Sequence, residues 1–109
     1  MSPSNAEPSG QELTIHIDLS NRQLGTSKER TELQHFADRL ESAIVAAGAG
    51  EYDGDEMGGG ECVLFFSGPD AEAIFSALHP LMRHNPLTRG ARVQLQDETG
   101  SQVVRQMRD

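Results

Sequence analysis

The sequence predicts an α+β fold of the ferredoxin-like kind, with two helices on one face of a four-stranded antiparallel sheet. Three observations predict it. Apolar residues alternate with polar ones in some segments, as in half-buried strands, and recur at helical spacing in others. These segments follow one another as strand, helix, strand, strand, helix, strand. Right-handed crossovers then give the strand order 4-1-3-2 and leave one sheet face without helical cover.

Length and composition fit one domain. The chain has 109 residues, of which 36% are hydrophobic and 24% charged. A domain of this size buries roughly 65% of its unfolded surface and folds without disulfides or metal. We expect a disordered tail at residues 1–11, which are rich in Ser, Pro and Gly, and a single domain at 12–109. One cysteine excludes an intrachain disulfide, and no signal peptide or membrane span is recognisable, so we expect a cytoplasmic location.

The first strand and the first helix have the clearest patterns. Residues 13–19 (L-T-I-H-I-D-L) alternate, with apolar side chains on one face and His16 and Asp18 among the polar ones on the other. Thr26 and Glu29 have the spacing of a capping box, which predicts the start of a helix. An apolar stripe at helical spacing follows it for several turns.

The next two strands form an acidic hairpin. The stretch G-E-Y-D-G-D-E-M-G-G-G-E at residues 50–61 combines carboxylates with glycines, and the run C-V-L-F-F follows it. Because this run is apolar on both faces, it is typical of a central strand. We interpret the three glycines at residues 58–60 as a three-residue turn, for which the positive φ of glycine is suited.

The length of this turn decides which side chains share a face. A three-residue turn places Asp53 opposite Phe65 and Asp55 opposite Val63 on the uncovered face, with Tyr52 on the helix side. A slip of one residue would turn the carboxylates towards the core without partners and Tyr52 outwards. We therefore favour the three-residue turn.

A helix, a strand and a C-terminal segment complete the fold. The string S-G-P-D-A-E-A-I-F opens the helix with acids in its first turn. Pro80 is expected to kink or shorten this helix, which ends by Pro86. Residues 91–96 alternate as a fourth strand, with Arg92 on the uncovered face. The segment around residues 103–104 either forms a short fifth strand or frays.

The net charge of -8 is concentrated in the middle of the chain. The segment from Leu40 to Met82 holds eight acids and no Lys or Arg, whereas nine acids and nine bases cancel elsewhere. Such a field repels nucleic acid and anionic membranes and attracts a basic partner or a cation. The alternative explanation is solubility alone.

The uncovered sheet face is the predicted functional surface. An apolar centre flanked by an acidic edge is typical of surfaces that bind proteins. The alternative is a solvated face with one exposed phenylalanine. The predicted function is that of a non-enzymatic, inhibitor-like module whose partner is a basic protein or a second copy of the chain. The predicted partner-binding residues are His16, Asp18, Glu51, Asp53, Asp55, Val63, Phe65 and Arg92.

A regulatory domain that binds a small ligand or a divalent cation is the alternative function. It would use the carboxylates of the acidic stretch, and the weak metal-ligand candidates are Asp53, Asp55 and Glu61. A calcium loop of the EF-hand type is excluded because Met57 occupies a ligand position. A phosphate-binding loop is excluded because the glycines lead into a strand and not into a helix. No cofactor is expected.

Enzyme motifs are absent from the sequence. Neither G-x-S-x-G nor C-x-x-C occurs, and Cys62 is predicted to lie in the core, where a thiol is inert. His16 beside Asp18 is the one suggestive pair, and a histidine near an aspartate on a surface usually has no catalytic role. We predict no catalytic residue.

The run from Gly50 to Phe75, about a quarter of the chain, resembles a stretch of small, uncharacterised bacterial proteins. Its pattern is G-E-Y-D-G-x-E-x-G-G-G-E followed by the strand and the helix start. The resemblance implies a bacterial origin and the same ferredoxin-like arrangement of strands and helices. It implies no activity and no binding residue.

Overall fold

The computed structural model describes residues 10–20, 25–83 and 85–107. Along the chain its elements are β2 (Gln11–Asp18), α1 (Ser27–Ala46), β3 (Glu51–Gly58), β4 (Glu61–Gly68), α2 (Ala71–Met82), the 3-10 helix η1 (Pro86–Thr88), β5 (Arg92–Gln96) and β6 (Gln102–Gln106). Most of the predicted disordered tail, residues 1–9, lies outside the described residues, and Gln11 already belongs to β2.

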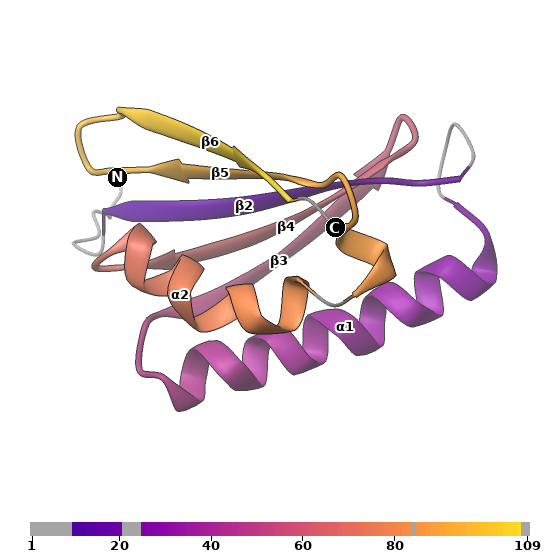
Figure 1. Ribbon diagram of the computed structural model, residues 1–109, viewed down its shortest axis with the longest axis horizontal. Helices are drawn as coiled ribbons and strands as arrows, with labels where there is room; N and C mark the ends of the chain where they lie inside the picture. The colour runs from indigo at the N-terminus through magenta and orange to yellow at the C-terminus, as the bar shows by residue number, and fades with distance from the viewer. Residues whose placement is uncertain (1–9, 21–24, 84, 108–109) are drawn as a thin grey trace.

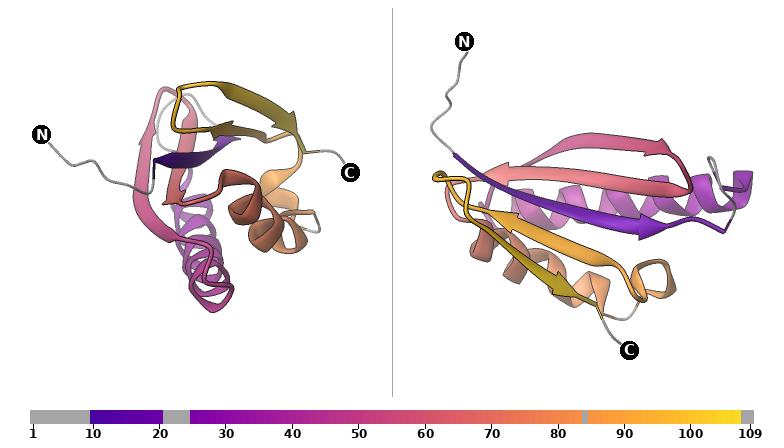
Figure 2. Two further views of the ribbon diagram at one scale, coloured as in Figure 1. Left: turned by 90° about the vertical axis from the view of Figure 1, so that its left-hand side faces the viewer. Right: turned by 90° about the horizontal axis from the view of Figure 1, so that it is seen from above.

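The strands form one antiparallel sheet in the order β3-β4-β2-β5-β6, and both helices lie on the same side of it (Figure 1 and Figure 2). The predicted α+β class is confirmed. The predicted four-stranded order 4-1-3-2 is wrong, because the order along the sheet, numbered by position in the chain, is 2-3-1-4-5. The difference is the fifth strand: β6 pairs with β5 over its whole length.

A tight turn between β5 and β6 accounts for this fifth strand. The Asp97 carboxylate accepts hydrogen bonds from the Thr99 hydroxyl at 2.6 Å and from the N–H groups of Thr99 and Ser101 at 2.9 and 3.0 Å. These bonds, the one from the Thr99 hydroxyl foremost, hold the pKa of Asp97 below its ordinary value. Gly100 has a φ of 89°, which favours glycine. The turn folds the C-terminal segment back on β5 as a hairpin.

Both helices begin where the sequence predicts. The Thr26 hydroxyl accepts from the Glu29 N–H at 3.1 Å, and the Glu29 carboxylate accepts from the Thr26 N–H at 2.9 Å, which confirms the capping box. Asp70 caps α2 by accepting from the Glu72 N–H at 3.0 Å. Pro80 lies inside α2, which ends at Met82.

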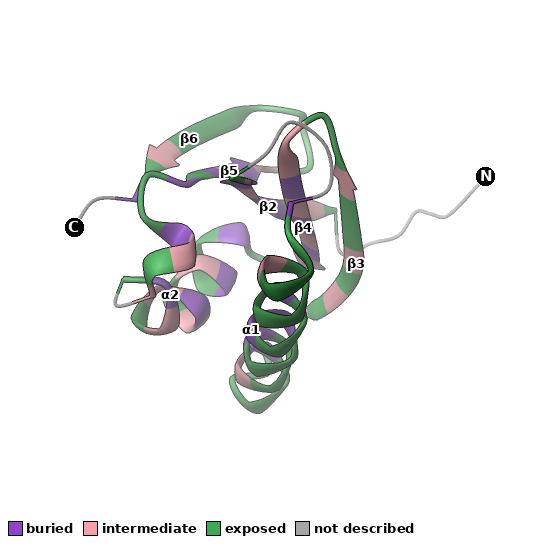
Figure 3. Cartoon of the chain, turned by 90° about the vertical axis from the view of Figure 1, so that its right-hand side faces the viewer, coloured by how far each residue is buried: buried purple, intermediate pink, exposed green. Residues whose placement is uncertain are grey.

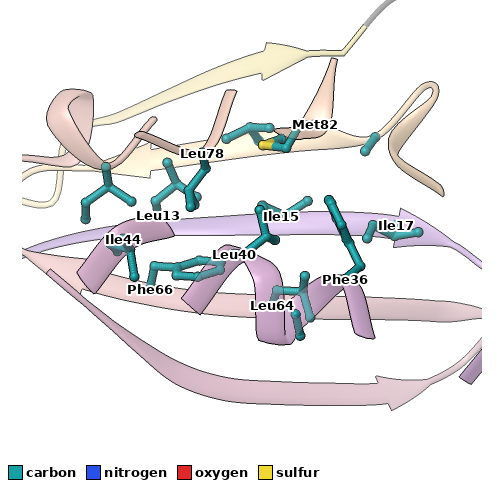
Figure 4. Packing of buried hydrophobic residues seen from close by; sticks show 14 of the residues in the cluster. Leu13, Ile15, Ile17, Phe36, Leu40, Ile44, Leu64, Phe66, Leu78 and Met82 are labelled. Carbon is teal, nitrogen blue, oxygen red and sulfur yellow. The ribbon is translucent and has the colours of Figure 1, made fainter. Parts of the chain in front are cut away.

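The core lies between the helices and the sheet face that they cover (Figure 4). Side chains from β2 and β4 meet the apolar stripes of both helices, and the outward sides of the helices are exposed (Figure 3). In the described part of the chain the opposite sheet face has no helix on it. The labelled core residues are Leu13, Ile15, Ile17, Phe36, Leu40, Ile44, Leu64, Phe66, Leu78 and Met82, each at most 2% exposed.

Candidate functional site on the open sheet face

The hairpin of β3 and β4 turns through two residues and not through the predicted three. Gly59 and Gly60 have φ values of 61° and 81°, positive at both central positions. This is the requirement of a type I′ turn, whose twist matches that of the two strands. Gly58 consequently pairs with Glu61, one residue away from the predicted register.

A one-residue slip without a bulge would turn Tyr52 outwards, but a β-bulge at Asp53 prevents this. Gly54 pairs with Phe65 and Tyr52 with Phe66, so that the register shifts at Asp53 between them. The extra residue reverses the alternation of sides along β3. Tyr52 therefore stays on the helix side, where its ring centroid lies 5.2 Å from that of Phe66.

The corrected register moves two acids to the opposite side of the sheet from the predicted one. Asp55 pairs with the buried Leu64, so it projects on the helix side, where the strand edge leaves it exposed. Burial raises the pKa of Tyr52 to about 12, and the Asp55 charge adds to this rise. Glu56, by contrast, pairs with Val63 and lies on the open face.

Cys62 lies in the core, as the sequence predicts, and is a free cysteine. Burial raises the pKa of its thiol to about 11, and the charges of Asp55 and Glu61 add to the effect. A thiol with this pKa stays protonated at neutral pH and is a poor nucleophile.

Cross-strand pairing arranges the open face in three rows of residues that cross all five strands and a shorter fourth row, Gly58–Glu61–Asp18. Val63 and Phe65 lie next to β2 near the centre and are partly exposed. The three longer rows run Glu56–Val63–His16–Arg92–Gln106, Gly54–Phe65–Thr14–Gln94–Val104 and Glu51–Ser67–Glu12–Gln96–Gln102.

Two shallow hollows cross these rows. One, of about 310 Å³, is lined by His16, Val63, Phe65 and the glutamines of β5, among others. The other, of about 370 Å³, follows the bulged strand and has Asp53 and Phe65 among its lining residues. Glu12, Thr14, Glu56 and Phe65 line both hollows, and Phe65 is the apolar side chain that the two hollows share.

His16 lies in a polar cluster beside this apolar centre. Its Nε2 is 3.0 Å from Oγ1 of Thr14, and its Nδ1 is 3.7 Å from Oε1 of Glu61. Glu61 also accepts from Nη2 of Arg92 at 2.6 Å. Among the described residues, the buried Nδ1 has no hydrogen-bond partner. At 3.7 Å the contact with Glu61 is an ion pair only when the imidazole is protonated.

The structure brings half of the predicted binding residues together. His16, Val63, Phe65 and Arg92 are neighbours on β4, β2 and β5. The others lie further out: Asp18 is exposed and pairs with Glu61, Glu51 pairs with Ser67 at the far end of β3, Asp53 occupies the bulge, and Asp55 lies on the other side.

Sequence reasoning placed Thr14 on this face but missed Glu12 and Glu56. Glu12 continues the same alternation as Thr14 and His16, which could have identified it. Glu56 could be placed only with the correct turn, and the G-G pair was the available signal. Among the described residues, the strand-paired carboxylates of the face are Glu12, Asp18, Glu51, Glu56 and Glu61, and one guanidinium, that of Arg92, accompanies them.

The metal-ligand candidates do not converge. Asp53 lies at the bulge, Asp55 projects on the helix side, and Glu61 is bonded to Arg92 on the open side. Within residues 10–20, 25–83 and 85–107, no three His, Cys, Asp or Glu side chains are grouped so that they could hold a metal ion.

No helix in the described ranges has the length and the apolar composition needed to cross a membrane. Comparison with protein-family models, with curated proteins and with solved structures found no significant match to this chain.

Proposed function

We propose that the chain is a non-enzymatic binding module that docks a basic protein segment on its open sheet face. The observation that carries the proposal is the arrangement of that face. Two partly exposed apolar side chains, Val63 and Phe65, lie near its centre. In the described part of the chain, five carboxylates and one guanidinium surround them.

The apolar centre provides the affinity of the proposed interface. Full burial of a side chain such as Phe65 contributes about 1.5–3 kcal/mol relative to full exposure, and the partly exposed ring retains a fraction of this. The two hollows that share Phe65 are able to accept apolar side chains of the partner. Aromatic anchors in hollows are the groups that dominate binding energies at protein interfaces.

The carboxylates determine which partner is favoured. Opposite potentials accelerate encounter and exclude like-charged partners. A dimer formed through the open face would bring the carboxylates of two copies together, so the charge favours a basic partner over a second copy at this surface.

The polar cluster supports binding rather than catalysis. The contact between His16 and Thr14 has the distance of a base–hydroxyl pair. An acyl-transfer site also needs free N–H donors for the developing oxyanion. The two residues stand on β2, which is paired on both sides by β4 and β5, so the sheet occupies its backbone N–H groups. The cluster instead positions Glu61 and Arg92 at the border of the apolar centre.

The cation-binding alternative is tested by thermal melting in chelator and in millimolar Mg²⁺ or Ca²⁺. We expect equal melting temperatures, because Asp53, Asp55 and Glu61 do not converge. A site at a hundred times its Kd would add about 2.7 kcal/mol to the free energy of unfolding. A shift that disappears in a variant with Asp53→Asn and Asp55→Asn would favour the alternative instead.

A random-peptide display library, selected on the wild-type chain, tests the proposed function. We expect the selected peptides to combine Lys or Arg with an aromatic or aliphatic residue. A selected peptide is then titrated into ¹⁵N-labelled protein. The backbone resonances that shift should belong to β4, β2 and β5, around Phe65 and His16, rather than to the exposed side of α1.

Matched variants decide whether the open face binds the peptide. Phe65→Ala and Glu56→Lys should each weaken binding by about tenfold or more. Val45→Ala and Glu41→Lys make the same kinds of change at exposed positions of α1 and should leave binding unchanged. Equal loss in all four variants, or selected peptides without basic residues, would contradict the proposal.

A further inference from the structure

β6 is the last strand of the sheet, so one side of its backbone has no neighbouring strand among the described residues. Val103 and Val104 are 50% and 60% exposed. The strand reads Q-V-V-R-Q and has no acid, although the chain as a whole has a net charge of -8. A regular edge strand with exposed apolar residues is a template on which another strand can pair.

The hydrogen bonds of the hairpin show which backbone groups of β6 point outwards. At one end the Asp97 N–H donates to the Ser101 carbonyl at 3.0 Å, and at the other the Met107 N–H donates to the Ala91 carbonyl at 2.8 Å. Bonded and non-bonded pairs alternate along an antiparallel ladder. The odd-numbered residues of β6 therefore bond to β5. The N–H and C=O groups of the even-numbered residues Gln102, Val104 and Gln106 point away from the sheet.

We propose that two copies of the chain pair through β6, antiparallel, about a two-fold axis at Val104. In this register Val104 lies opposite Val104 of the second copy, and Gln102 lies opposite Gln106. All three are residues with outward-pointing backbone groups, so each pair exchanges two N–H···O=C bonds. The two five-stranded sheets become one continuous sheet.

The side chains of β6 are compatible with this register. On the helix side Val103 lies opposite Arg105 of the second copy. The Arg105 guanidinium is already held by both oxygens of Glu72, at 2.7 Å each, and lies 5.0 Å from the Phe75 ring centroid. Its charge is therefore compensated within its own copy, and Val103 meets the aliphatic part of the side chain. Within Gln102–Gln106 no carboxylate faces another across the axis.

The pairing partner that best fits β6 is β6 of a second copy of the chain. The register is self-complementary: Gln102 of each copy meets Gln106 of the other, and Val104 meets Val104. An isologous interface requires this reciprocity. Pairing of β6 with β3 of another copy would be less favourable, because β3 is interrupted by the bulge at Asp53. The interface therefore closes as a dimer and does not extend to a filament.

Sedimentation equilibrium of the full chain, from low micromolar to submillimolar concentration, tests the dimer. Val104→Glu places two carboxylates opposite each other and should raise the dimer dissociation constant by at least about tenfold. Val45→Glu changes a valine that is 63% exposed on α1 and should leave the dimer intact. Phe65→Ala should also leave it intact, because Phe65 lies on β4, and both β2 and β5 lie between β4 and β6. A monomer at every concentration, or a dimer that survives Val104→Glu, overturns the proposal.

Disulfide cross-linking tests the register without depending on dimer strength. Opposed residues of a hydrogen-bonded pair have Cα atoms about 5.5 Å apart, which suits a disulfide. Val104→Cys should cross-link with itself, whereas Gln102→Cys and Gln106→Cys should cross-link only when the two variants are mixed. Cys62 is buried and does not compete. Cross-linking of Gln102→Cys with itself, or equal cross-linking of Val45→Cys, overturns the proposed register.

Discussion

The two edges of the sheet differ in how they respond to the approach of another strand. β3 has four carboxylates, at Glu51, Asp53, Asp55 and Glu56, and its ladder is interrupted by a bulge. β6 has no carboxylate, and its ladder with β5 is regular over its whole length. Charge and bulges are the devices that keep edge strands from pairing, and here only one of the two edges has them.

Unequal protection of the two edges directs the association of a small sheet to one side. With two unprotected edges, pairing would repeat from copy to copy without an end. With one edge protected, pairing through the other is limited to two copies. The acidic stretch then has a second role besides solubility and attraction of a basic partner, because it protects the β3 edge.

The largest expected effect lies where β3 begins. A Cβ on Gly68 would collide with the backbone carbonyl of Ala49, whereas a Cβ on Gly58 would meet nothing within 4 Å. Neither residue has a positive φ, so the two alanine variants differ mainly in this contact. Gly68→Ala should lower the free energy of unfolding by about 3 kcal/mol, measured by urea denaturation. If Gly68→Ala and Gly58→Ala were equally stable, the close approach of Gly68 to the Ala49 carbonyl would not contribute to the stability of the β3 edge.

Alkaline pH should lower the free energy of unfolding through Tyr52 on β3 and Cys62 on β4. The pKa of Cys62 is raised from 9.0 to about 11 and that of Tyr52 from 10.0 to about 12. In both cases the unfolded chain loses the proton first, so the free energy of unfolding falls as pH rises, from 9 for Cys62 and from 10 for Tyr52. The Tyr52 contribution, reduced for its partial exposure, is about 1 kcal/mol.

Urea denaturation as a function of pH, on wild type and Tyr52→Phe, measures this contribution. The variant should lose the fall between pH 10 and pH 12 and keep the fall that begins near pH 9. If the two proteins had parallel pH profiles, Tyr52 would not be the group that titrates.

Deletion of Asp53 would remove the bulge from β3, so that both edge strands would have regular ladders. Without this residue Tyr52 and Gly54 become adjacent and keep their partners Phe66 and Phe65 in a regular ladder. The free energy of unfolding should change by less than about 1 kcal/mol, because the bulge residue has no pairing partner. Sedimentation equilibrium should then show species larger than a dimer. Asp53→Ser keeps the bulge and should not form them.

The smallest expected effect concerns how β6 is attached to α2. Glu72→Gln removes the charge that both nitrogens of Arg105 contact. Because the pair is partly exposed, the free energy of unfolding should fall by about 0.5 kcal/mol, and by less at high salt. Thermal melting at two salt concentrations checks this. A salt-independent loss would indicate that packing of the side chain, rather than its charge, holds β6.

Local sequence patterns were sufficient for the α+β class, for both helix starts and for the alternation of β2. The capping hydrogen bonds join Thr26 to Glu29 and Asp70 to Glu72. Because the partners are only two or three residues apart, the local sequence is enough to predict these helix starts. The same holds for the open-face positions of His16, Val63, Phe65 and Arg92, which follow from the two-residue period of strands.

The register of β3, the side on which Asp55 and Glu56 project, and the pairing of β6 needed the three-dimensional structure. Two and three glycines can both close a hairpin, and the choice depends on how Tyr52 and Met57 pack against the core from a bulged strand. The fifth strand likewise forms because β5 is available as a pairing partner for residues 102–106. Contacts between residues far apart in the chain decide these features, because a strand has no hydrogen-bonding partner of its own until another strand lies beside it.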